Sequence, residues 1–104
     1  MGSDWKKFRA LVPTLRERYI ADRNAEVARI LGDSKKTETE RFWDAFEITK
    51  KAAKVVHNCL DGHSRSKMWF YMITMRGEGM LKPEDLAGFS DDIQKRVFDD
   101  PFET

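Results

Sequence analysis

Residues 68–75 read Met-Trp-Phe-Tyr-Met-Ile-Thr-Met, a segment that is apolar on every side if it forms a helix. A surface helix keeps a polar face toward water, and this segment has none. It must therefore be covered by the rest of the domain or by a second copy of the chain. Trp69, Phe70 and Tyr71 are consecutive, so on a helix they point in directions about 100° apart. At least one of them is expected to reach a boundary of the domain or a partner.

A short basic lip, His63-Ser64-Arg65-Ser66-Lys67, stands directly before this segment. We expect Ser64 to cap the apolar helix, which we place near residues 64–76. Its first turn would offer free backbone N–H groups beside two hydroxyls and two cations, a combination that suits an anion. Positive charge in a first turn opposes the helix dipole. The lip therefore favours either an external anion or an acidic partner within the protein, with ordinary helix capping as the simpler alternative.

The composition fits one helical domain spanning residues 1–104, with 40% hydrophobic and 36% charged residues. No run of about 18 apolar residues is present, so we expect no membrane span. The N-terminus shows no apolar signal region, and the lone Cys59 cannot form an intramolecular disulfide. These features predict a cytoplasmic protein.

Charge is divided unevenly along the chain. Residues 1–76 hold 16 Lys and Arg against 10 Asp and Glu, a net charge of +6, whereas residues 77–104 hold 3 against 8, a net charge of −5. The simpler interpretation is that the acidic segment packs beside the basic body and neutralises it. A basic face left open to nucleic acid is the alternative, although such domains usually carry a larger overall excess than +1.

Helical signals recur throughout the sequence. Pro13 predicts a boundary at the preceding residue, so we expect helices over 4–11 and 13–31, with a single kinked helix as the alternative. Later starts are marked by the Thr37–Glu40 capping box, by Pro83 and by Ser90. No strand pattern appears. The predicted fold is all-α: an irregular bundle of five to six helices with the apolar helix near residues 64–76 at its centre.

The clearest periodicity follows the capping box. Apolar positions recur at alternating steps of four and three residues, at Phe42, Phe46, Thr49, Ala53, Val56 and Leu60, with Trp43, Ala52 and Cys59 beside them. Such a stripe predicts a core-facing side. The short link at 61–63 predicts that this helix pairs antiparallel with residues 68–75. We therefore expect Phe46 to lie deep, with Phe46→Ala lowering stability by about 3–5 kcal/mol.

Two polar sets contain residue types that can bind a metal. One contains metal-competent residues at every second position, His57, Cys59, Asp61 and His63. Spacing by two on a helix turns neighbours away from each other, so these residues are not expected to converge. The other is a line of acids, Glu40, Asp44 and Glu47, which lacks the Glu-x-x-His motif of dimetal sites. We therefore predict no metal and no cofactor.

These patterns favour a small, soluble interaction module that self-associates and has no catalytic activity, with Trp69, Phe70 and Tyr71 as candidate interface residues. The partner is expected to be a second copy or another protein. One alternative is phosphate or nucleic-acid binding through residues 63–67, assisted by Lys50, Lys51 and Lys54. Another is a small enzyme with His57 or His63 as general base. No glycine-rich phosphate loop or nucleophile elbow supports the enzyme alternative.

Overall fold

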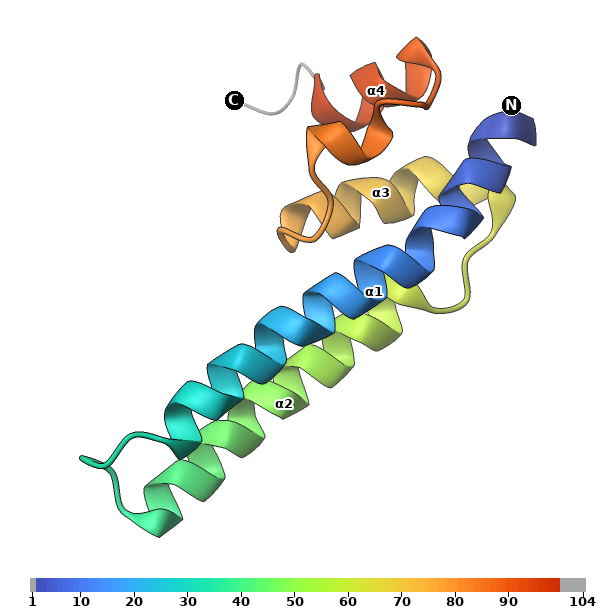
Figure 1. Ribbon diagram of the computed structural model, residues 1–104. Helices are drawn as coiled ribbons and strands as arrows, with labels where there is room; N and C mark the ends of the chain where they lie inside the picture. The colour runs from blue at the N-terminus through green and yellow to red at the C-terminus, as the bar shows by residue number, and fades with distance from the viewer. Residues whose placement is uncertain (1, 100–104) are drawn as a thin grey trace.

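A computed structural model describes residues 2–99 as an all-helical chain with no strand in that range (Figure 1). The all-α prediction is confirmed. The expected five to six helices are instead four α-helices and two short 3₁₀ turns. The elements in chain order are α1 (Gly2–Leu31), α2 (Glu38–Leu60), η1 (Arg65–Lys67), α3 (Met68–Gly77), η2 (Pro83–Leu86) and α4 (Asp91–Phe98).

Helix α1 is one continuous helix of 30 residues with Pro13 inside it. The two-helix prediction is therefore wrong, and the single-helix alternative is correct. Proline cannot donate a backbone hydrogen bond, so its interior position destabilises the helix. Burial of one face offsets that loss, because side chains at helical spacing on both sides of Pro13 are buried: Phe8, Val12, Leu15 and Tyr19.

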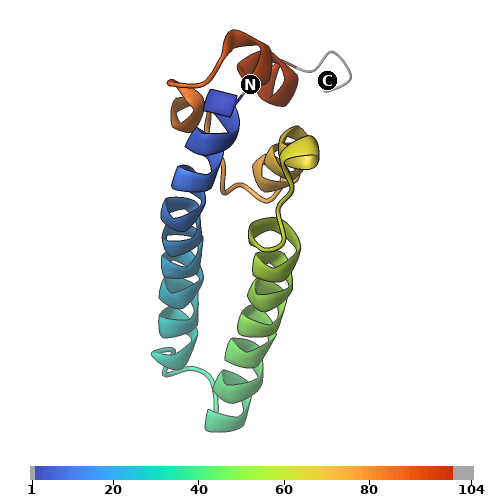
Figure 2. The same cartoon turned by 90° about the vertical axis from the view of Figure 1, so that its right-hand side faces the viewer.

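Helix α2 begins as predicted. The Thr37 side chain accepts a hydrogen bond from the Glu40 backbone N–H at 3.1 Å, and the Glu40 carboxylate accepts one from the Thr37 N–H at 2.8 Å. The helix then runs antiparallel along α1, and the two form a long hairpin (Figures 1 and 2). Its most buried side carries small residues, Ala52 and Cys59, in line with the half-buried Ala45 and Ile48.

The remaining elements form a head at one end of this hairpin. Helix α3 lies between the hairpin and α4, beside the start of α1 (Figures 1 and 2). The innermost side chains come from all these parts and are fully buried: Phe8, Leu15, Leu60, Met72, Met75, Leu86 and Val97. Within residues 77–99, Asp85 of the acidic C-terminal segment pairs with Arg18 of the basic body at 2.6 Å, which fits the simpler interpretation of the charge pattern; residues 100–104 lie outside the described part.

The distal half of the hairpin stands clear of the head. The dimensions are 52 × 29 × 19 Å and the radius of gyration is 16.5 Å, against about 13 Å for a compact domain of this length. No residue between Ile20 and Lys51 is buried. The predicted antiparallel pairing of α2 with α3 is wrong, because the chain turns at Gly62, whose φ is +69°, and α3 then crosses the end of the hairpin.

Candidate functional site

The basic lip does not form one site. His63 is half-buried between the rings of Phe8 and Tyr71, at centroid distances of 4.9 and 4.8 Å. Its Nε2 lies 2.7 Å from the Cys59 carbonyl oxygen, and because a carbonyl can only accept, Nε2 carries the hydrogen. His63 therefore connects the end of α2 to α1 and α3 and does not face a ligand.

The other lip residues form the 3₁₀ turn that precedes α3. The Ser64 side chain makes no capping hydrogen bond, which corrects the predicted cap. Arg65 and Ser66 line a pocket in the head, whereas Lys67 lines a shallower hollow with Trp69 and Phe70. The predicted anion site is thus divided, and only Arg65 and Ser66 belong to a pocket of substantial size.

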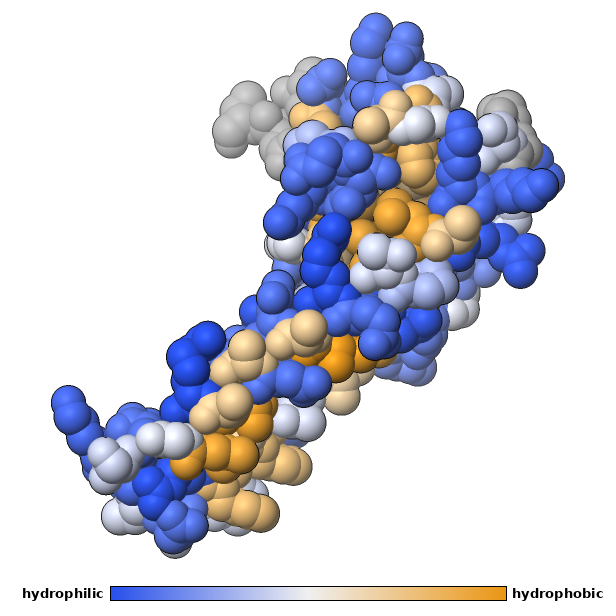
Figure 3. Space-filling view, viewed as in Figure 1, coloured by the Kyte–Doolittle hydropathy of each residue, from blue (hydrophilic) through white to orange (hydrophobic). Residues whose placement is uncertain are grey.

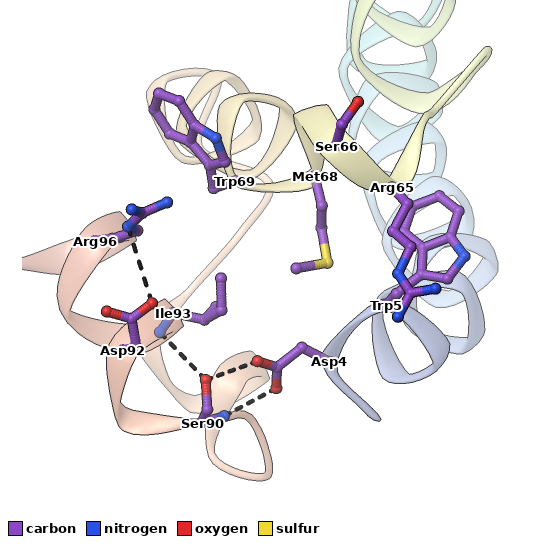
Figure 4. A pocket seen from close by; sticks show the side chains of 10 residues that line it. All are labelled: Asp4, Trp5, Arg65, Ser66, Met68, Trp69, Ser90, Asp92, Ile93 and Arg96. Atoms are coloured by element: carbon purple, nitrogen blue, oxygen red, sulfur yellow. Dashed lines mark hydrogen bonds and ion pairs between the residues drawn. The ribbon is translucent and has the colours of Figure 1, made fainter. Parts of the chain in front are cut away.

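This head pocket has a volume of about 560 Å³ and is bounded by α1, the η1–α3 junction and α4 (Figure 4). Met68 and Ile93 point into the space between Trp5 and Trp69, which lie on opposite sides of it. Of the residues that line the pocket, Arg65, Ser66 and Trp69 were singled out from the sequence. The lining comes from three segments far apart in the chain, and no local pattern links such segments.

Asp4 closes the lower edge of the pocket. It is buried and accepts two hydrogen bonds from Ser90, one from the backbone N–H at 3.0 Å and one from the hydroxyl at 2.6 Å (Figure 4). Burial by itself would raise the pKa of Asp4, but the hydrogen bonds from Ser90 hold that pKa below its usual value. Asp4 is therefore a charged group whose acceptors are already engaged.

A second feature is an aromatic face on α2, made of Phe42, Trp43 and Phe46. Their exposed fractions are 60%, 55% and 45%, which contradicts the expectation that Phe46 lies deep. The rings contact each other edge to face, with centroid distances of 5.0 Å from Phe42 to Trp43 and 5.8 Å from Trp43 to Phe46. Leu31, at the end of α1, is also exposed. Apolar surface is visible along this part of the hairpin in Figure 3.

A groove of about 330 Å³ lies next to the aromatic face, between α1 and α2. Its α2 side is lined by small side chains, including Thr49, Ala52 and Ala53, one to two turns beyond Phe46. Val27 lines it from α1. Along α2, the aromatic face is therefore followed by a groove lined in part by small side chains.

The charges of α2 are also arranged in two blocks. Residues 38–47 carry four acids and one base, a net charge of −3, whereas residues 48–60 carry three lysines and no acid, a net charge of +3. Part of the acidic block has partners within the chain, since Asp44 pairs with Lys36 at 2.7 Å and Glu40 serves the capping box. No partner within the described chain is found for Glu47, Lys51 or Lys54.

Neither polar set forms a metal site within the described residues, where no group of three potential ligands converges. Cys59 is buried, and burial raises the pKa of its thiol. Asp61 pairs with Arg16 at 3.4 Å and lies 4.0 Å from His57. His57 is itself exposed and lies away from the head pocket.

Comparison with known protein families, with curated proteins and with solved structures finds no match for this chain. Over the residues that the structure describes, no helix has both the length and the apolar character needed to cross a membrane. The inference of function therefore starts from the aromatic face and the head pocket.

Proposed function

We propose that this chain is a small cytoplasmic interaction module that self-associates through the aromatic face of α2 and has no catalytic activity. The observation that carries this proposal is the exposure of Phe42, Trp43 and Phe46 on a helix whose other side already packs on α1. An aromatic side chain carries roughly 150–250 Å² of surface, so three half-exposed rings present about 300 Å² of it. The largest apolar patch on a typical monomer covers about 300–600 Å² and is often functional, so this face is a candidate contact surface.

The partner that fits this face best is a second copy of the chain in antiparallel orientation. A two-fold axis beside Thr49 places the −3 block of one α2 opposite the +3 block of the other. The same axis brings Phe46 near the second copy's Ala53, an exposed small residue that lines the groove. Two hairpins joined in this way form a four-helix bundle, which covers the distal half that the head leaves exposed.

The α3 residues that were predicted as interface candidates are not part of the proposed dimer interface. Trp69 and Phe70 are exposed, but Tyr71 is half-buried against His63. They lie in the head, at the opposite end of the hairpin from the aromatic face. Trp69 and Phe70 therefore serve as a comparison surface of similar chemistry.

Light scattering coupled to size-exclusion chromatography tests the proposal with Phe46→Glu and a matched control, Phe70→Glu. Both residues are exposed phenylalanines on helices, so the two substitutions place the same charge at sites of similar exposure. We expect wild type and Phe70→Glu to be dimers at micromolar concentration and Phe46→Glu to be a monomer with unchanged helical circular dichroism. A monomeric wild type, or a Phe46→Glu protein that remains dimeric, would refute the proposal.

The two alternative functions gain no support from the geometry. The lip side chains that would bind phosphate diverge, and a single carbonyl engages the Nε2 of His63. Among residues 2–99, no acid lies within 4 Å of His63, and Asp61, the acid beside His57, lies on an open surface.

A further inference from the structure

We infer that the head pocket is a binding site for a small aromatic carboxylate, held between Trp5 and Trp69 with its acidic group on Arg65. This inference is independent of self-association, since α3 and α4, which help to line the pocket, lie at the opposite end of the molecule from the start of α2, which carries the aromatic face (Figure 1). A volume of about 560 Å³ lies within the range of small-ligand sites, about 300–1,000 Å³.

The apolar part of the site determines the shape of the ligand. Trp5 and Trp69 stand on opposite sides, and Met68 and Ile93 form the surface between them (Figure 4). Trp5 also stacks on Phe8 at a centroid distance of 5.9 Å. Because Phe8 is fully buried, this contact holds the Trp5 indole in place. Two indoles beside a methionine and an isoleucine suit a flat, apolar body such as a fused aromatic ring.

The charged groups determine where its acidic group binds. Arg96 lies over the Trp69 ring at 5.7 Å and 3.9 Å from the Asp92 carboxylate. Asp4 is engaged by Ser90. Within the described residues, the guanidinium of Arg65 has no hydrogen-bond or ion-pair partner, although it lines the same pocket. Arg65 is therefore the cation available to a carboxylate, which it can bind through two parallel hydrogen bonds.

Ser66 also lines the pocket, but its side-chain hydroxyl points away from the Arg65 guanidinium (Figure 4). Arg65 therefore supplies the charged contact without Ser66, and the pocket is suited to one carboxylate group on an otherwise apolar ligand.

Nuclear magnetic resonance tests this inference because the chain has three tryptophans, two in the pocket and one, Trp43, on α2. The probe is 2-naphthoate, with the neutral 2-naphthamide as its isosteric control. The ¹H–¹⁵N indole signals are assigned with single Trp→Phe variants. We expect 2-naphthoate to shift the signals of Trp5 and Trp69 and to leave that of Trp43 in place.

The charge contact is tested with Arg65→Gln and a matched control, Lys67→Gln, which removes a neighbouring cation that does not line this pocket. We expect Arg65→Gln to weaken 2-naphthoate binding about tenfold, to the level of 2-naphthamide, and Lys67→Gln to leave it unchanged. Shifts confined to Trp43, shifts of all three indoles, or equal binding of the acid and the amide would each overturn the inference.

Discussion

At the scale of single residues, one ion pair ties α1 to the C-terminal segment. Arg18 donates to both carboxylate oxygens of Asp85, at 3.1 and 2.6 Å, and to the carbonyl of Met80 at 2.8 Å. Asp85 also accepts a hydrogen bond from the Lys82 N–H at 2.8 Å. Burial would raise the pKa of Asp85, but the hydrogen bonds from Arg18 and Lys82 hold it below its usual value of 3.8. A carboxylate with a lowered pKa stabilises the fold in its charged form.

We expect Asp85→Asn to lower the free energy of unfolding at pH 7 by about 1.5–3 kcal/mol, the range for hydrogen bonds to charged groups. Because the folded pKa is lowered, this stabilisation is present above about pH 4 and is lost as the pH falls through the folded pKa. The difference between wild type and variant should therefore shrink at pH 3. Urea melts at both pH values measure it, with the exposed Asp92→Asn as control. A difference that grows on acidification would show that the sign is wrong.

At the scale of elements, several local signals predicted helix ends correctly, whereas the boundary at Pro13, the cap at Ser64 and the long-range packing were not predicted correctly. The capping box at Thr37, the end of α3 at Gly77 and the start of α4 after Ser90 are all confirmed, because each depends on a few neighbouring residues. The side of α2 that was predicted to face the core is instead exposed, because that helix has two apolar sides. Ala52 and Cys59 on one side let α1 approach closely, whereas the bulky Phe42 and Phe46 on the other side do not.

The residues of the candidate site also fall into two groups, those that local sequence pointed to and those that only the packing brings together. The sequence placed a functional hypothesis on residues 63–67, and two of the five, Arg65 and Ser66, line the head pocket. Trp5 and Ile93 could not be predicted to join them, since they lie at opposite ends of the chain and meet only through the packing of the head. Predicting the pocket would have required knowing that α3 crosses the hairpin.

The exposure of Phe46 changes the expected effect of truncating it. Phe46→Ala should lower the free energy of unfolding by less than about 1 kcal/mol in dilute, monomeric protein, because little buried surface is lost. Met72→Ala should lower it by about 2–5 kcal/mol, because Met72 is fully buried in the head. Urea melts of both variants at low protein concentration compare the two helices. Equal losses would mean that Phe46 is covered within a single copy.

At the scale of the whole molecule, stability and association are divided between two ends. The buried core lies in the head and the adjoining half of the hairpin. The distal half contributes no buried residue, and helices in proteins derive most of their stability from packing an apolar face. The distal hairpin is therefore the part of the chain that gains most from a partner, and its charge blocks specify how that partner lies.

The antiparallel orientation predicts the outcome of exchanging charges at Glu47 and Lys51, which a two-fold axis beside Thr49 places opposite each other across the interface. Glu47→Lys and Lys51→Glu should each weaken the dimer by about 1–2 kcal/mol, since two attractive pairs become repulsive. Combining both changes in one chain restores the attraction and should restore the affinity. Sedimentation equilibrium measures these constants, and high salt should reduce the differences.

In a parallel dimer each residue would face its own copy, and Glu47→Lys would only replace one repulsive pair with another. Dimers whose affinity is unchanged by the single substitutions would therefore rule out the antiparallel arrangement while leaving self-association through the aromatic face intact.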